Sequence, residues 1–249
     1  TMPRFYVEDC SDAQEQIAIT GEDVNHIKNV LRLSVGDALT VCDGNGKEYT
    51  CSIAAVEKDV VYAKIEDINQ NAAELPCAIT LFQGMPKSDK LEFIIQKAVE
   101  LGAAEIVPVM MKRTVVKLED KKKAKKLERY QAISESAAKQ SGRGVIPKVS
   151  DFCSFSQALA RAGEFDVMLL PYESAEGITY AREVIAQAAE LPAGSKVAIF
   201  IGPEGGFAQE EVAAAKDKGA KVITLGNRIL RTETAGLTVL SILMFQMER

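Results

Sequence analysis

Two glycine-bearing turns near the C-terminus hold the residues best suited to bind a small molecule. The first turn spans 201–207 and contains Gly202, Gly205 and Gly206, and the second spans 225–235. Each turn follows a hydrophobic run and precedes an amphipathic helical pattern. Strand-to-helix turns of an α/β sheet expose backbone donors and commonly bind ligands. Two such turns in series therefore predict a cofactor cleft.

The familiar nucleotide fingerprints do not identify the cofactor. A dinucleotide fold would open with G-x-G-x-x-G and a nucleotide hydrolase would contain G-x-x-x-x-G-K-[ST], and the sequence has neither. A tight turn alone would need the same glycines as a ligand site. In the second turn, however, Ile229 and Leu230 could pack against an adenine ring while neighbouring amides bond to its edge. The two turns together are therefore more specific than either one.

Alternating strand and helix patterns supply the framework for these turns. Apolar runs predict strands at 78–83, 105–110, 146–149, 166–170, 196–201 and 221–225. One-face spacing predicts helices at 89–101, 123–140, 156–161, 178–189, 208–218 and 232–246. Ser88 or Asp89 could cap the first of these helices, and Gly102 would end it. The alternation predicts a mostly parallel sheet covered on both faces.

The first 75 residues follow a different pattern. Only the short stretch 23–31 is helical in character. Alternating residues at 38–42 and 48–53 flank the turn 43–46, which is a strong hairpin signal, and 60–65 predicts another strand. We expect a small β-barrel-like domain, joined to the rest of the chain by a polar linker at 69–76.

Charge is unevenly distributed along the chain. The net charge of −5 divides into −8 for residues 1–75, +7 for 76–150 and −4 for 151–249. The run Lys121–Lys126 is the densest part of the basic middle third, which also includes Lys112, Arg113, Lys117, Arg129, Lys139, Arg143 and Lys148. Because counterion release depends on local contacts, such a segment can bind phosphates despite the negative total. The lysine run is equally well interpreted as a solvated helix start.

Composition excludes several other classes of protein. No apolar run approaches the ~18 residues of a membrane span. The five cysteines form no C-x-x-C pair and the chain has a single histidine. A zinc site is therefore not expected, and a reducing compartment is the natural one. We predict a cytoplasmic protein with no metal and no membrane partner.

The segments 90–102, 201–206 and 225–235 resemble the RsmE family, whose members are uridine-N3 methyltransferases of small-subunit ribosomal RNA in the SPOUT superfamily. Residues 3–5 and 25–33 resemble the family's PUA-like RNA-binding domain. The resemblance implies an α/β fold with a PUA-like β-barrel at 1–72 and a SPOUT methyltransferase domain with a deep C-terminal trefoil knot at 73–249. It further implies a homodimer, S-adenosylmethionine as cofactor and 16S ribosomal RNA of the small subunit as partner. Two alternatives stay open: a knotted methyltransferase acting on tRNA or another base atom, and a non-catalytic RNA-binding assembly factor.

The resemblance assigns the cofactor to residues of both glycine-bearing turns and of the strand end near 170. These residues are Leu170, Pro171, Ile201, Gly202, Pro203, Glu204, Gly205, Leu225, Gly226, Ile229, Leu230, Arg231 and Thr234. The loop 171–175 departs from the family pattern. RNA contacts are expected from Arg4, Asn25, His26, Arg32, Lys87, Arg113 and Arg143. For His26, a cap of a local turn is the alternative.

Methyl transfer to uridine N3 requires alignment of the two groups and loss of the N3 proton. Negative charge then spreads onto the flanking carbonyls, and Arg231 is the candidate cation that stabilises it. A guanidinium stays protonated, so the proton acceptor would be Glu204, Glu233 or water. Thr232 has the character of an N-cap, and an acid in the first turn favours the helix dipole, so we favour capping over catalysis for Glu233. For Glu204 the two interpretations are equally supported.

Overall fold

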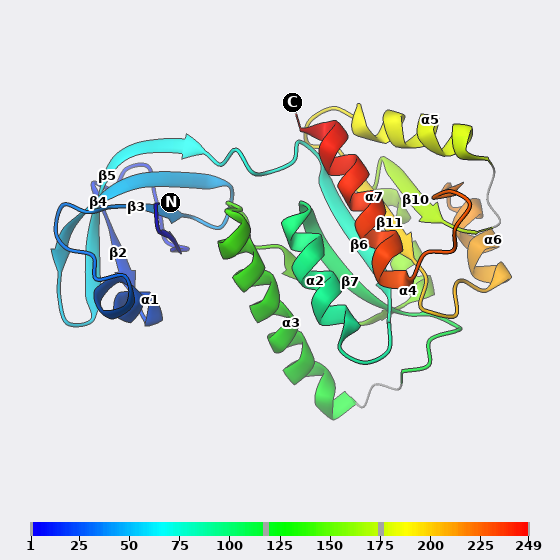
Figure 1. Cartoon of the computed structure of the whole chain (residues 1–249), viewed down its shortest axis with the longest axis horizontal. Coiled ribbons are helices and arrows are strands. Elements are labelled where there is room, and N and C mark those ends of the chain that lie inside the picture. Colours follow the sequence, from blue (N-terminus) through cyan, green and yellow to red (C-terminus); the bar gives the residue numbers. More distant parts are fainter. Residues whose placement is uncertain (1, 117–119, 174–176, 249) are drawn as a thin grey trace. The chain divides into compact units, whose positions relative to one another are not determined.

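The computed structural model describes residues 2–116, 120–173 and 177–248, apart from the side chains of residues 120 and 121. Figure 1 shows the chain. It divides into two compact units. Unit 1 comprises residues 1–74 and 138–146, and unit 2 comprises residues 75–137 and 147–249. The short segment 138–146 therefore folds with the N-terminal residues although it lies far from them in sequence.

The sheet of unit 1 has the strand order β1-β3-β4-β5-β2. β1 pairs with β3 in parallel and the other neighbours are antiparallel. The strands are β1 (Arg4–Tyr6), β2 (Gln16–Thr20), β3 (Ala38–Cys42), β4 (Lys47–Val56) and β5 (Val60–Gln70). The predicted hairpin is confirmed, with Gly44 at φ 76° and Gly46 at φ 103° in its turn. Neither β1 nor β2 was predicted from the sequence.

Two predictions for unit 1 need correction. Within the described residues no strand pairing joins β1 to β2, so hydrogen bonding leaves the predicted barrel open as a sheet with two edges. The predicted linker at 69–76 is partly built into the unit, because β5 runs to Gln70 and Asn71 is buried. Glu74 accepts hydrogen bonds from the backbone N–H groups of Gly144 and Val145. The predicted helix at 23–31 is α1 (Glu22–Asn25) followed by the π-helix η1 (His26–Val30).

The sheet of unit 2 has the order β12-β10-β11-β6-β7-β8, with β9 also on β7, and each of these pairs is parallel. Its strands are β6 (Ala78–Gly84), β7 (Ala103–Met110), β8 (Lys148–Val149), β9 (Cys153–Ser154), β10 (Val167–Pro171), β11 (Lys196–Ile201) and β12 (Lys221–Ile223). The predicted parallel sheet is confirmed. Buried apolar runs such as 197–201 suit such a sheet because both of its faces are covered.

Helices cover both faces of this sheet. α2, α5 and α7 pack beside one another on one face, where α7 crosses β6 and β11 (Figure 1). α4 and α6 pack on the other, around the stacked rings of Phe82 and Phe200. The helices are α2 (Lys90–Glu100), α3 (Asp120–Ser141), α4 (Phe155–Ala160), η2 (Arg161–Glu164), α5 (Ile178–Ala189), α6 (Gln209–Asp217) and α7 (Thr232–Met247). The predicted mixed α/β architecture is therefore confirmed.

The ends of α2 test the predicted caps. Gly102 follows the helix at φ 90°, as predicted for a glycine that ends a helix. At the other end Asp89 occupies the N-cap position, one of the two predicted, but its side chain makes no capping hydrogen bond, and Ser88 before it has φ 56°. The loop before α2 is thus held in a left-handed conformation that a residue with a side chain rarely adopts.

Candidate active site

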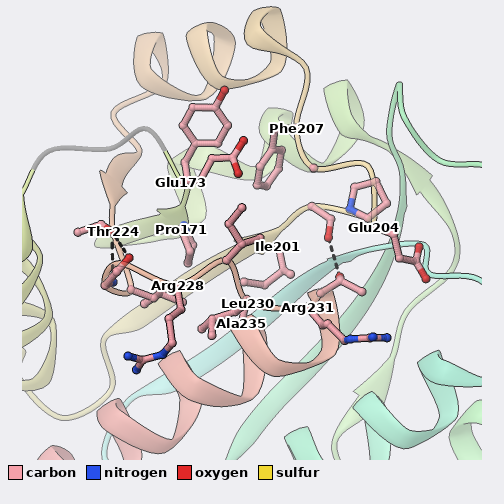
Figure 2. A pocket seen from close by; sticks show the side chains of 18 of the residues that line it. Pro171, Glu173, Ile201, Glu204, Phe207, Thr224, Arg228, Leu230, Arg231 and Ala235 are labelled. Carbon is pink, nitrogen blue, oxygen red and sulfur yellow. Dashed lines mark hydrogen bonds between the residues drawn. The ribbon is translucent and has the colours of Figure 1, made fainter.

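A pocket of about 630 Å³ lies at the carboxyl ends of three neighbouring parallel strands, β10, β11 and β12. Both glycine-bearing turns line it, together with the residues that follow β10 (Figure 2). Its lining comprises Lys90, Arg113, 171–173, Gly177, Ile178, 201–207, 224–232 and Ala235. The carboxyl edge of an open parallel sheet is where α/β proteins bind their ligands. The predicted cleft is therefore a real cavity formed by both turns.

The first turn is pressed against the end of β6. A Cβ on Gly84 would lie 2.5 Å from the nitrogen of Pro203, and a Cβ on Gly202 would lie 3.1 Å from the backbone of Gly206. Gly206 has φ 68° and donates its N–H to the carbonyl of Pro203. Only glycine fits such close backbone approaches. The part of the pocket wall formed by the first turn is therefore closely packed glycine backbone.

Thr232 joins the first turn to helix α7. Its hydroxyl donates to the carbonyl of Gly202 at 2.6 Å and accepts from the side-chain amide of Gln83 at 2.8 Å. Gln83 is fully buried at the end of β6. The prediction that Thr232 is an N-cap is wrong, because Arg231 occupies that position and Thr232 is the first helical residue. The threonine instead fixes the pocket wall to two elements of the core.

The second turn brings apolar side chains to the pocket. Figure 2 shows Leu230 close to Pro171 and Ile201. Gly226, at φ 108°, donates its N–H to the hydroxyl of Thr224 at 3.2 Å, which closes the turn. Ile229 lies at the rim and is 84% exposed. Apolar side chains beside exposed backbone could hold a heterocyclic base, as the sequence predicts.

Charged side chains gather at one end of the pocket. The ammonium of Lys90 lies 3.3 Å from a carboxylate oxygen of Glu204 and 3.4 Å from one of Glu233. Burial alone would raise the pKa of Glu204, but the backbone N–H of Lys87 and the ammonium of Lys90 hold it below its ordinary value. Figure 2 shows Arg231 at this same end. Both carboxylates that the sequence offers as proton acceptors are therefore held by one lysine.

The structure brings most of the predicted cofactor residues together. The lining includes Pro171, Ile201, Gly202, Pro203, Glu204, Gly205, Leu225, Gly226, Ile229, Leu230 and Arg231. Leu170 and Thr234 are not in it. Leu170 is fully buried among the side chains packed on α4 and α6, because successive residues of a strand point to opposite faces. Thr234 is exposed on the first turn of α7.

Several lining residues escaped the sequence prediction. Lys90 opens the segment 90–102 that carries the resemblance, so its position in the motif was the available signal. Tyr172 and Glu173 directly follow the predicted Pro171, in the loop 171–175, of which residues 174 and 175 lie outside the described part. Arg113, predicted to bind RNA, also lines the pocket and donates to the carbonyl of Gly205 at 3.0 Å.

Two basic residues predicted to bind RNA are held inside unit 1. Arg4 pairs with Glu48 at 2.8 Å. Arg143 is 3% exposed and its guanidinium pairs with Glu74 at 2.5 Å. Tyr6 donates its hydroxyl to the carbonyl of Arg143. Arg143 is therefore a structural residue here and offers no surface to RNA, while Arg4 is partly covered.

The other predicted RNA residues lie on surfaces. Asn25, His26 and Arg32 are exposed on unit 1. The His26 ring packs edge-on against the Phe5 ring, with 6.2 Å between the ring centroids. Lys87 is exposed on unit 2. Of the lysine run, Lys122 and Lys125 are exposed on the first turns of α3. Lys117 and the side chain of Lys121 lie outside what the structure describes.

Among the described residues, no group of three or more histidine, cysteine, aspartate or glutamate side chains could hold a metal ion. No helix in the described ranges is long and apolar enough to cross a membrane.

Comparison with known protein families gives the class. A family model for an RNA methyltransferase domain matches residues 73–244, which contain the whole pocket lining. A second model, for an RNA methyltransferase PUA domain, matches residues 19–66, which lie in unit 1. The two-domain organisation implied by the resemblance is thus confirmed in its coarse form.

Individual relatives narrow the class. The chain is 40% identical over 250 residues to the ribosomal RNA small subunit methyltransferase E of Bacillus subtilis, covering 99% of this chain and 98% of that protein. It is 31% identical to the enzyme of that name from Mycobacterium tuberculosis, covering 95% and 88%. A crystal structure of the Neisseria gonorrhoeae enzyme bound to S-adenosylmethionine superposes with a TM-score of 0.80 at 33% identity, covering 97% and 96%. The chain belongs to the ribosomal RNA small subunit methyltransferase E family, as the sequence motifs predicted.

Proposed function

We propose that this protein transfers a methyl group from S-adenosylmethionine to N3 of a uridine in the 16S RNA of the small ribosomal subunit. The observation that carries the proposal is the pocket at the ends of β10, β11 and β12, which contains both glycine-bearing motifs. Relatives similar over nearly the whole chain are named ribosomal RNA small subunit methyltransferase E, and one of them is described with S-adenosylmethionine bound.

The pocket residues fit this cofactor. Gly202 and Gly206 bring the backbone of the first turn close together, and a Cβ on Gly202 would crowd Gly206. Leu230 supplies an apolar surface for adenine. A volume of about 630 Å³ is in the range of small-molecule sites. The predicted trefoil knot belongs to this proposal, since the loops after β10, β11 and β12 line one pocket. So do the predicted domain boundaries, 1–72 for RNA binding and 73–249 for methyl transfer.

S-adenosylmethionine supplies the electrophilic methyl group when bound. Arg231 then stabilises the negative charge that spreads over the uracil carbonyls as N3 loses its proton. Glu204 is poorly suited to accept that proton, because the N–H of Lys87 and the ammonium of Lys90 hold its pKa below the ordinary value. Glu233 is engaged by the same ammonium. Of the predicted acceptors, a water molecule fits these contacts best.

RNA binding by the exposed residues Asn25, His26, Arg32, Lys87 and Arg113 remains part of the proposal. The homodimer stays a prediction that light scattering on the purified protein would test. A ribosomal RNA substrate agrees with the predicted cytoplasmic location.

The function is tested by incubating the protein with S-adenosylmethionine and either small ribosomal subunits or tRNA, and then analysing the nucleosides by mass spectrometry. We expect N3-methyluridine in the 16S RNA only. Methylation of tRNA or of another atom would favour a related methyltransferase. Calorimetry that detects RNA binding but no S-adenosylmethionine binding would favour an assembly factor.

A further inference from the structure

Lys90 connects three separate segments at the charged end of the pocket. It is the first residue of α2, and its ammonium bridges Glu204 of the first glycine-bearing turn and Glu233 of the first turn of α7. The three side chains are 32%, 28% and 19% exposed, respectively, so the bridge is largely shielded from water. Contacts of this kind are screened less than those between fully exposed charges.

The Lys90 ammonium offsets the repulsion between the two carboxylates that it contacts. Glu204 and Glu233 share one cation, so removal of that cation would leave two half-buried carboxylates facing the same position. Like charges at close range destabilise each other, and one carboxylate then takes up a proton more readily. Among other polar groups near Glu204, the N–H of Lys87 donates to it, and Arg113 and Arg231 line the same pocket. Lys90 is the group among these that contacts both carboxylates.

We propose that Lys90 is a positioning residue of the methyl-transfer site. By holding Glu204 and Glu233 together, it fixes the first glycine-bearing turn against the start of α7, where Arg231 is the N-cap residue. Lys90 acts on the cofactor and on Arg231 through these two carboxylates. This inference rests on the proposed function, because it assigns S-adenosylmethionine to the pocket.

The role has a distinctive pH dependence. In Lys90→Met the two carboxylates repel each other at pH 8, where both are ionised, and the turn loses its anchor. As the pH falls, one carboxylate is protonated and the repulsion ends, so the defect shrinks. A direct contact between the Lys90 ammonium and the cofactor would give a defect with no such dependence. Replacement of Glu233 by Gln should relieve the same repulsion at every pH.

The experiment measures S-adenosylmethionine affinity by calorimetry and methylation rate for each variant of the full chain, at pH 8 and at about pH 5, which approaches the ordinary glutamate pKa of about 4.3. We expect Lys90→Met to weaken cofactor binding about tenfold at pH 8, a usual size for coupled charges in contact, and less at the lower pH. Lys90→Arg, which keeps the charge and the bridge, should recover most of the affinity. The double variant Lys90→Met with Glu233→Gln removes the repulsion without restoring the bridge, so it should recover only part of the affinity. The matched control is Lys97→Met on the same helix, whose ammonium pairs with Glu100 away from the pocket lining.

A wild-type protein that binds no S-adenosylmethionine would refute the proposed function itself. If the wild type binds and Lys90→Met binds equally well, the positioning role is wrong. It is also wrong if the loss is the same at both pH values and the double variant does not recover. Should Lys90→Met alone fail to fold, as judged by circular dichroism, the double variant decides: recovered folding and binding support the role, and continued failure contradicts it.

Discussion

The two units treat their charged side chains differently. In unit 2, the charges at the pocket lie on the glycine-bearing turns and on the first residues of α2 and α7, and they remain at the cavity. In unit 1, Arg4 and Arg143 are bound by Glu48 and Glu74. A basic residue in a nucleic-acid-binding domain can therefore serve the fold before it serves the ligand. The difference shows that the pocket follows from local sequence, whereas the basic side chains left exposed on unit 1 are decided only by its folding.

The segment 138–146 sharpens this contrast. Residues 1–75 have a net charge of −8. The segment 138–146, which folds with them in unit 1, contributes the basic residues Lys139 and Arg143. The Lys139 ammonium lies 5.9 Å from the centre of the Tyr6 ring, and Arg143 neutralises Glu74. The basic middle third thus supplies cations that stabilise the acidic unit as well as cations exposed on unit 2.

The largest effect should come from the pocket of unit 2. Arg231→Ala should lower the methylation rate about 100- to 1,000-fold, the usual effect of removing one group that stabilises transition-state charge. Affinities for RNA and cofactor should change far less, because the charge develops only during reaction. Single-turnover kinetics together with filter binding measure the two quantities.

The matched control for Arg231 is Arg228→Ala, in the same turn. Figure 2 shows Arg228 on the opposite side of the pocket from Glu204 and Arg231. Its substitution should reduce the rate much less than Arg231→Ala does. Equal losses of rate and RNA affinity in Arg231→Ala would show that it is a binding residue, and the contrast between the units would weaken.

In unit 1 the comparison predicts a loss of stability rather than of chemistry. Arg143→Ala leaves Glu74 without its cation in a mostly buried site and should lower the free energy of unfolding of unit 1 by about 3 kcal/mol. Arg32→Ala, on an exposed residue, should leave that energy nearly unchanged and weaken RNA binding instead. Urea unfolding and RNA titration distinguish them. If Arg143→Ala reduced RNA affinity without loss of stability, Arg143 would be an RNA-binding residue after all.

A smaller effect is expected where β6 meets the first turn. Gly84→Ala places a methyl group 2.5 Å from the nitrogen of Pro203, so the turn must shift, at a cost of about 2 kcal/mol in stability. Cofactor binding, followed by calorimetry, should weaken as well because the turn forms the pocket wall. Gly163→Ala is the control, since a Cβ there meets no atom within 4 Å. Similar behaviour of the two variants would mean that the turn is free to move.

Local patterns predicted most of unit 2 and most of the pocket, because each glycine-bearing turn is continuous in sequence and lies at the end of its own strand. Thr232 was misjudged because its partners, Gln83 and Gly202, are distant in sequence. Leu170 lies outside the pocket lining because the neighbour of a pocket residue in a strand points into the core.

The same limit applies more strongly to unit 1. The strand β1 is three residues long and exists through its parallel pairing with β3, which no local pattern records. The roles of Arg4 and Arg143 depend on Glu48 and Glu74, which lie 44 and 69 positions away. Interactions between distant residues thus decide which basic side chains remain available for RNA.

The smallest expected change in RNA affinity concerns the lysines at the start of α3, which also test the contrast between the charged side chains of the two units. Lys122, Lys125 and Lys126, replaced together by Gln, should flatten the salt dependence of RNA affinity by about 0.7 in log–log slope for each phosphate of single-stranded RNA that is no longer bound. The same number of charges removed elsewhere in unit 2 should matter less. The control variant combines Lys216→Gln on α6, Lys218→Gln directly after that helix and Lys196→Gln on β11. Because counterion release reports phosphate binding directly, an unchanged slope would identify the lysine run as a solvated helix start. RNA binding would then depend on exposed residues such as His26 and Arg32 in unit 1 and Lys87 in unit 2.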